Sequence, residues 1–291
     1  MNKEVHFVID KLDSLVNRAV EDKPFAHLPF RELDALIGGV KLGRLVILSG
    51  EPGAGKTTLV HQIADSLAEQ GHPVLYFSYE MPPSALVAKS LVRLSNNSLT
   101  IRDINHRDDD PFVQQELNEA IKRYKNAASN LALISTSKPC TTTDIGVMVG
   151  NCEGRFNKKP IVIVDYLQIV PTDSDISDER LQVKEVVSAL RRIAVSHDVP
   201  IFAISSVNRS SYNKTKVGLD SLGSSSFIEY SADSVLFLSI EGKGEERIVN
   251  SSLPIRPVCV SVLKNRYSSV GEARFLFEPS KARFLERPTD G

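Results

Sequence analysis

One stretch of the sequence decides the expected fold, and it reads Leu45-Val46-Ile47-Leu48-Ser49-Gly50-Glu51-Pro52-Gly53-Ala54-Gly55-Lys56-Thr57-Thr58-Leu59. An apolar run, a glycine-rich segment and the start of a helical pattern follow one another, which predicts a buried strand, a tight loop and a helix. The loop has the complete G-x-x-x-x-G-K-T spacing of a phosphate-binding loop. The residues expected to bind a nucleotide are Gly50, Glu51, Pro52, Gly53, Ala54, Gly55, Lys56, Thr57 and Thr58.

Each part of this loop suits a polyphosphate. Glycines without a Cβ let successive backbone N–H groups point at the phosphates, and the following helix adds the partial positive charge of its N-terminus. We expect Lys56 to meet the β- and γ-phosphates and the Thr57 hydroxyl to ligate the bridging Mg²⁺. The alternative, a chance loop, does not explain why the pattern lies between a strand and a helix. The sequence therefore predicts ATP and Mg²⁺ as ligands.

The composition is that of a globular protein with a sizeable core. The chain has 291 residues, of which 42% are hydrophobic and 24% charged, and its formal net charge is −1. Without a general basic excess, any nucleic-acid contact must come from a local patch. The three cysteines have no metal-ligand spacing, which favours buried, reduced thiols in a cytosolic protein. We find no signal peptide and no apolar run that could span a membrane, so we expect a cytoplasmic protein.

The rest of the chain alternates short apolar runs with helical patterns. Such alternation predicts an α/β fold, with a doubly wound, mostly parallel sheet that binds its ligand at the carboxyl ends of the strands. After the strand that enters the loop, the expected strands are 73–78, 131–135, 161–165, 200–205, 233–240, 258–263 and 272–278. The expected helices are a short one within 30–40 and longer ones over 59–71, 83–95, 111–127, 142–156 and 179–197.

The N-terminal segment forms a separate pattern. Residues 4–20 place apolar side chains at spacings of three and four between charges, which predicts an amphipathic helix ending before Pro24. Its apolar stripe can pack on its own domain. Alternatively it can dock on a neighbouring subunit, because residues 21–29 form a linker long enough to let it leave.

Two acidic residues close expected strands. Asp165 ends a continuously apolar run, which is the place of a Walker B aspartate that holds Mg²⁺ directly or through water. Alternatively, it caps the next helix. Glu80 ends the second strand beside the phosphate loop, where it could act as the general base that activates an attacking water, or be a surface acid. Asp144 and Asp233 lack such a context, and we interpret both as structural.

Two groups of cations each have two interpretations on sequence alone. Arg209, Lys214 and Lys216 lie in a polar loop with an interleaved tyrosine, which suits single-stranded nucleic acid, although composition alone favours a solvated surface loop. The acidic residues between 172 and 179 do not favour a nucleic-acid surface there.

Lys264 and Arg266 lie two residues apart at a strand end and so point to one side. They could serve a second subunit's nucleotide as a finger supplied in trans, or simply protect a sheet edge.

Over residues 28 to 280 the chain resembles the C-terminal RecA-like ATPase domain of DnaB-type replicative helicases. The resemblance rests on the phosphate loop and on further motifs in the same order. These motifs are Phe77-Ser78-Tyr79-Glu80-Met81, Val164-Asp165-Tyr166-Leu167-Gln168, Asn208-Arg209-Ser210, Ile228-Glu229-Tyr230-Ser231-Ala232-Asp233, Lys264-Asn265-Arg266 and Gly271-Glu272. It implies a RecA-like P-loop NTPase fold with antiparallel strands at the C-terminal end, divided into residues 1–27, a helix and linker, and residues 28–291, the ATPase domain.

The resemblance also implies a ring, usually of six subunits, with ATP at each interface. Lys56 and Thr57 would bind phosphate and metal, Asp165 would serve the metal and Glu80 would be the catalytic base. Lys264 and Arg266 would reach the neighbour's γ-phosphate, and the loop after Asn208 would line a DNA channel. The N-terminal helix is similar to the family's linker helix, which favours docking on the adjacent subunit.

Two features depart from the family pattern. Its N-terminal helical domain, which binds primase, has no counterpart in residues 1–27. Ser206 stands where the family has a glutamine that contacts the γ-phosphate and relays its presence to the channel loop, which puts coupling in question. We therefore expect an ATP-hydrolysing, ring-forming helicase or translocase on single-stranded DNA, with a possible loader or replication protein as partner. The alternatives are a RecA-superfamily ATPase switch or loader that binds a protein, and a nucleotide-binding module with negligible turnover.

Overall fold

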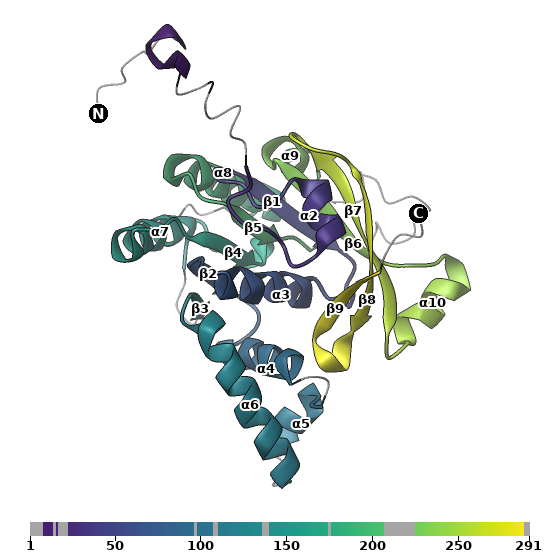
Figure 1. The fold of residues 1–291 in the computed structure, drawn as a ribbon. Coiled ribbons are helices and arrows are strands. Elements are labelled where there is room, and N and C mark those ends of the chain that lie inside the picture. Colours follow the sequence, from purple (N-terminus) through teal and green to yellow (C-terminus); the bar gives the residue numbers. More distant parts are fainter. Residues whose placement is uncertain are drawn as a thin grey trace.

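The computed structural model describes residues 8–13, 16, 23–95, 98–106, 110–135, 140–173, 176–206 and 225–287. These residues form a nine-stranded sheet in the order β3-β2-β4-β5-β1-β6-β7-β8-β9 with helices on both faces (Figure 1). The strands are β1 (Leu45–Gly50), β2 (Val74–Ser78), β3 (Leu131–Ser135), β4 (Ile161–Asp165), β5 (Ile201–Ile204), β6 (Ser234–Ile240), β7 (Arg256–Asn265), β8 (Gly271–Glu278) and β9 (Arg283–Arg287).

The helices alternate with the strands through most of the chain. They are α2 (Arg31–Ile37), α3 (Lys56–Glu69), α4 (Pro83–Leu94), α5 (Ile101–His106), α6 (Pro111–Ala128), α7 (Thr142–Phe156), α8 (Glu179–His197), α9 (Ser225–Ser231) and α10 (Gly244–Ser252), with 3-10 turns η1 (Val8–Lys11), η2 (Leu167–Ile169) and η5 (Pro279–Lys281). Strands β3, β2, β4, β5, β1 and β6 pair in parallel, and β6 to β9 pair antiparallel. The predicted fold class, a mostly parallel sheet with antiparallel strands at the C-terminal end, is confirmed.

Alternation along the central strands divides the core into two clusters. In β4, Ile161 and Ile163 pack in the cluster under α3, whereas Val162 and Val164 pack in the cluster under α7 and α8. A strand points successive side chains to opposite faces, so the next residue, Asp165, faces the α3 side. The alternation of side chains along each strand therefore also determines on which face of the sheet, and against which helices, the polar residue at the end of that strand lies.

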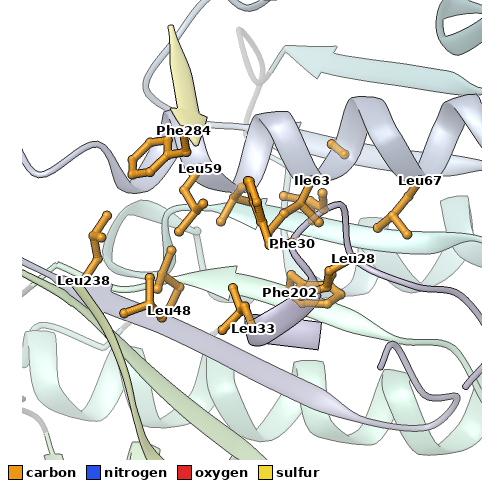
Figure 2. Packing of buried hydrophobic residues seen from close by; sticks show 14 of the residues in the cluster. Leu28, Phe30, Leu33, Leu48, Leu59, Ile63, Leu67, Phe202, Leu238 and Phe284 are labelled. Atoms are coloured by element: carbon orange, nitrogen blue, oxygen red, sulfur yellow. The ribbon is translucent and has the colours of Figure 1, made fainter. Parts of the chain in front are cut away.

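Helix α3 is the centre of one cluster. Figure 2 shows Leu59, Ile63 and Leu67 along one side of α3, pointing toward the sheet residues Leu48 and Phe202. Leucine and isoleucine at spacings of four lie above one another on one helix face, so this stripe packs α3 flat on the sheet. Because α3 begins in the glycine-rich loop, the same packing fixes the loop at the carboxyl ends of the strands.

Local hydrogen bonds explain where several helices begin. The Thr141 side chain accepts from the Asp144 backbone N–H while the Asp144 carboxylate accepts from the Thr141 N–H at 2.8 Å, which is a capping box. This contact confirms the structural interpretation of Asp144. The Asp110 and Asp178 side chains cap α6 and α8 in the same sense, by accepting backbone N–H groups of the first turn.

Four short elements were not predicted, namely α5, α9, α10 and β9. Helix α10 has no buried residue and therefore no apolar stripe to reveal it. Helix α5 spans only six residues, and strand β9 follows a single 3-10 turn after β8. Of the predicted N-terminal helix, the structure describes residues 8–13 and 16. Within it η1 forms a 3-10 turn, and Val8 and Ile9 are exposed.

Residues 25 and 26 are held to the body of the protein by backbone contacts with Val40. The Phe25 backbone N–H donates to the Val40 carbonyl at 2.7 Å, and Ala26 pairs with Val40 in an isolated bridge. In the part of the chain that the structure describes, no helix combines the length and apolar character needed to cross a bilayer.

Candidate nucleotide-binding site

The phosphate loop joins β1 to α3 in a shape that only glycine tolerates at two positions. Gly55 has φ 98°, and a Cβ built there would lie 2.8 Å from the rings of Phe277 and Phe284. At Gly50 a Cβ would lie 2.3 Å from the Leu238 carbonyl oxygen. Both glycines have a positive φ, and at both a Cβ would collide with neighbouring atoms. A residue with a side chain therefore does not fit at either position, which explains the glycine spacing of the motif.

Lys56 lies over the loop it belongs to. Its Nζ donates to the carbonyl oxygens of Gly50 at 2.8 Å and Glu51 at 3.0 Å. Burial lowers the pKa of Lys56 from its usual value, whereas the charges of Asp165 and Glu80 act to raise it. The ammonium group is therefore held at the mouth of the loop, facing two carboxylates.

These groups share one cavity of about 400 Å³ at the carboxyl edge of the sheet. It is lined by Pro52, Gly53, Gly55, Lys56, Thr57, Thr58, Glu80, Asp165, Tyr166, Ile204 and Ser206. The structure thus brings together the loop, Glu80 and Asp165, which are far apart in sequence. Tyr79, next to Glu80, donates its backbone N–H to the Asp165 carbonyl at 2.8 Å, which keeps the ends of β2 and β4 together.

Three of the predicted loop residues do not line the cavity. Gly50 makes the close approach to β6, and Ala54 is fully buried. Glu51 is buried and turns toward α10, where it forms an ion pair with Arg247 and accepts from the Ile240 backbone N–H at 3.4 Å. The geometry gives Glu51 a role in shaping the loop, which the motif alone did not indicate.

Asp165 is positioned as a metal-binding carboxylate would be. Its side chain is 1% exposed, and its Oδ2 accepts from the Tyr76 hydroxyl at 2.9 Å. Burial raises the pKa of Asp165, while hydrogen bonds from Tyr76 and Thr57 lower it. Its Oδ1 has no hydrogen-bond partner among the described residues.

An orphaned buried carboxylate oxygen beside a threonine hydroxyl fits Mg²⁺. This ion usually keeps several waters and takes one or two protein ligands together with substrate phosphates. Thr57 and Asp165 would supply those two ligands. Within the described residues there is no group of three or more histidine, cysteine or acidic side chains arranged for a metal.

Lys264 and Arg266 lie at the amino ends of β1 and β6, at the edge of the sheet opposite the phosphate loop. Lys264 Nζ donates to the Ala232 carbonyl at 2.8 Å, and Arg266 contacts the Tyr230 carbonyl and the buried Asp233 carboxylate. Asp233 also pairs with Arg191 and accepts from the Leu45 N–H at 2.9 Å, so its structural interpretation is confirmed. The length of β1, at about 3.3 Å per residue, separates this edge from the phosphate loop, so these cations do not reach their own chain's cavity.

The predicted DNA-contacting residues Arg209, Lys214 and Lys216 lie outside the described residues. The last described residue before them is Ser206, which lines the cavity. The Gln168 side chain holds its backbone from both sides: Nε2 donates to the Ser206 carbonyl at 3.1 Å and Oε1 accepts from the Ser206 N–H at 3.1 Å. The end of β5 is therefore tied to the turn that follows Asp165.

Comparison with known proteins identifies the family. Residues 27–286 match the family described as the DnaB-like helicase C-terminal domain. The chain belongs to this family. The replicative DNA helicase DnaB of Buchnera aphidicola (strain APS) is 26% identical over 262 residues, covering 88% of this chain and 54% of that protein. The DnaB of Mycoplasma genitalium is 30% identical over 268 residues, covering 89% and 55%. The chain thus spans about half the length of these relatives.

Solved structures of similar proteins share the fold. One solved ATPase domain superimposes with a TM-score of 0.84 at 21% identity, covering 98% of this chain and 100% of that chain. A DnaB-like replicative helicase, studied with its primase interactions, gives a TM-score of 0.80 at 21% identity and covers 97% of this chain and 67% of that chain. At this identity the likeness shows the fold alone.

Sequence reasoning missed several residues of the site. Tyr76 bonds Asp165, Gln168 holds Ser206 and Arg247 pairs with Glu51. Tyr76 had a signal, because a tyrosine in the middle of an apolar buried strand must find a partner for its hydroxyl. Arg247 had none, since α10 lacks the pattern that would have placed it.

Proposed function

We propose that the chain is the ATP-hydrolysing motor domain of a ring-forming, DnaB-like helicase or translocase that acts on single-stranded DNA. The observation that carries the proposal is the meeting of Lys56, Thr57, Glu80 and Asp165 on one cavity at the carboxyl edge of the sheet. A phosphate loop alone supports only binding. A loop together with two carboxylates supports hydrolysis, because one acid can serve the metal while the other activates water.

The residues have distinct roles in this proposal. The loop backbone and Lys56 bind the β- and γ-phosphates, and Thr57 and Asp165 hold Mg²⁺. When bound, Mg²⁺ neutralises charge on the phosphate oxygens. Glu80 is exposed at the cavity, so it can accept a proton from a water that enters from solvent.

The cations at the far edge support a shared site. Lys264 lies at the end of β7 and Arg266 directly follows it, on the side of the sheet opposite the phosphate loop, so they can serve a neighbouring subunit's nucleotide and not their own. A cation supplied in trans contributes about 10³ to 10⁵ in rate in phosphoryl-transfer enzymes that use one. We therefore propose an assembly with sites between subunits, in a ring that the family resemblance suggests has six members. A loader or replication protein is a further proposed partner.

The test is the ATPase rate of the full chain against its own concentration, with and without single-stranded DNA. We expect the rate per subunit to rise steeply as the chain assembles and to rise again with DNA, with DNA affinity falling as salt is added. Glu80→Gln should retain nucleotide binding without turnover. A rate that follows concentration but ignores DNA supports instead the ATPase switch that binds a protein. Absence of turnover in a confirmed oligomer supports a nucleotide-binding module.

A further inference from the structure

A polar cluster lies beneath the nucleotide cavity, between the sheet and helices α3 and α4. It contains Tyr76 on β2, His61 on α3 and Ser90 on α4. Tyr76 and His61 are both 0% exposed, so neither touches nucleotide or solvent. Polar groups buried this deeply are hydrogen-bonded for a structural or functional reason, because leaving them unpaired is costly.

The hydroxyl of Tyr76 is aimed at the candidate metal ligand. Tyr76 pairs with Ile163 in the parallel ladder of β2 and β4, and both face α3. Asp165 is two residues beyond Ile163 on the same face, so the tyrosine ring extends along the sheet toward its carboxylate. The hydroxyl donates to Oδ2 at 2.9 Å, while Oδ1 has no hydrogen-bond partner among the described residues.

His61 fixes the tyrosine ring from the opposite side. The two rings meet edge to face, with centroids 5.6 Å apart and planes at 83°. His61 Nε2 lies 2.9 Å from the Leu86 carbonyl and 2.8 Å from Ser90 Oγ. A carbonyl only accepts, so Nε2 carries the proton and the ring is anchored to α4. The position of the Tyr76 ring is therefore set by His61 of α3, which is itself anchored to α4.

We propose that Tyr76 is a positioning residue that holds the Asp165 carboxylate by Oδ2 and so reserves Oδ1 for Mg²⁺ or for a water on it. The inference rests on the metal role of Asp165 in the proposed function. A hydrogen bond from a neutral donor stabilises the ionised carboxylate, which burial alone would disfavour. Burial and the neighbouring acids raise the pKa of Tyr76 well above its usual value, so the hydroxyl keeps its proton and remains a donor.

The experiment measures nucleotide binding, independent of turnover. A fluorescent ATP analogue is bound to the full chain with excess EDTA and then over a Mg²⁺ titration, and the Mg²⁺ concentration at half effect is recorded. Removing a partner of a metal-binding side chain typically costs 10- to 100-fold in metal affinity, so Tyr76→Phe should raise this midpoint about tenfold or more. Binding in EDTA should be unchanged, because the loop and Lys56 are untouched.

Matched variants separate positioning from packing. Tyr79→Phe removes a hydroxyl that donates to the Cys140 carbonyl at 2.8 Å in the core cluster on the other face of the sheet, and it should leave the midpoint unchanged. Tyr76→Met lacks a donor but fills the core, so it should reproduce the defect even where Tyr76→Phe folds poorly. In an Asp165→Asn background, Tyr76→Phe should add nothing, because the carboxylate it positions is gone.

Two results would overturn the inference: an unchanged Mg²⁺ midpoint in both Tyr76 variants, or an equal rise in Tyr79→Phe. Asp165→Asn reports on the proposed function separately. If it leaves the midpoint unchanged, the metal role of Asp165 fails. If it raises the midpoint while the Tyr76 variants do not, only the role of Tyr76 fails.

Discussion

A buried aspartate lies at each end of the parallel strands, Asp165 at the carboxyl edge and Asp233 at the opposite, far edge. The negative charges of these two carboxylates are compensated differently. Asp233 is fully buried, and Arg191, Arg266 and the Leu45 N–H surround it. Asp165 is 1% exposed but receives its hydrogen bonds from neutral hydroxyls, while Lys56 is bound to loop carbonyls. A carboxylate whose charge is neutralised within the chain stabilises the fold. A carboxylate left short of a cation beside a cavity is prepared for one that arrives with the substrate.

The comparison also explains how cations are distributed. Arg266 neutralises Asp233 only in part, since its Nη1 lies 3.7 Å from Oδ1 and the residue remains 40% exposed. Under the proposed function, this exposed positive charge is available to a partner subunit, and the Asp165 Oδ1 that faces the cavity is available to a metal. In an assembly, the positive charge at the far edge of one copy could therefore complement the nucleotide site at the carboxyl edge of another copy. Substitutions at either edge test this complementarity.

The largest expected effect concerns the shared site. Lys56→Ala and Arg266→Ala should each lower the ATPase rate of the assembled chain by about 10³-fold. A mixture of the two should regain activity, because some interfaces then combine an intact phosphate loop with an intact arginine. Rates of the mixture are compared with each variant alone, and Arg274→Ala, at an exposed arginine of β8, serves as the control. Absence of rescue in a mixed oligomer would place the whole site in one chain.

The second effect concerns pH and the support of the carboxyl edge. Burial lowers the pKa of His61 to about 4, with Arg93 and Lys89 acting in the same direction and Asp65 against them. The unfolded chain takes up this proton near pH 6.5, so the free energy of unfolding should fall by about 3 kcal/mol as the pH drops from about 6.5 to about 4.

Denaturant unfolding across this pH range measures that slope. His61→Gln should have a shallower slope, because it has no proton to take up. Parallel slopes in this variant and the wild type would show that His61 does not carry the dependence.

The third effect concerns the exposed acid of the cavity. Glu80→Gln removes the proposed base but keeps the shape and polarity of the side chain, so turnover should fall about 10²-fold or more while nucleotide affinity is retained. Steady-state ATPase and fluorescent-nucleotide binding measure the two separately. Glu245→Gln, at an exposed position of α10, should affect neither. Unimpaired turnover in Glu80→Gln would remove Glu80 as the base.

The smallest effect concerns the far edge alone. Asp233→Asn leaves Arg191 without its buried partner, but Arg191 is 26% exposed and can recover water, so the loss of stability should be about 2 kcal/mol. Urea unfolding measures it, with Glu119→Gln, in a surface pair with Lys122, as the control expected to be near neutral. Nucleotide binding in EDTA should not change. A loss of binding would show that the two edges are mechanically coupled within one chain.

Much of the candidate site could be predicted from the sequence because its determinants are local. The glycines and Lys56 are fixed by the shape of one turn, and the apolar strand before Asp165 predicts a carboxylate at the carboxyl edge. Glu80 follows the same logic at the end of β2. Most strands and helices were predicted for the same reason, since their apolar patterns have the periods of buried strands and half-buried helices.

The rest depended on contacts between distant segments. Tyr76 and Asp165 are 89 residues apart, and only the register of β2 beside β4 brings the hydroxyl to the carboxylate. Arg247 and Glu51 meet because α10 returns toward the loop, and no local pattern predicts that return. The antiparallel direction of β7 places Lys264 and Arg266 at the opposite edge, which is a property of topology and not of their spacing.

The sequence by itself determined that a phosphate loop, two acids and an α/β fold belong together, because steric and periodic constraints act within a few residues of each motif. The tertiary structure decided which charges are neutralised inside the chain and which are left for a ligand or another subunit. Burial and strand order set those balances, and both arise only when segments from the whole chain pack against one another.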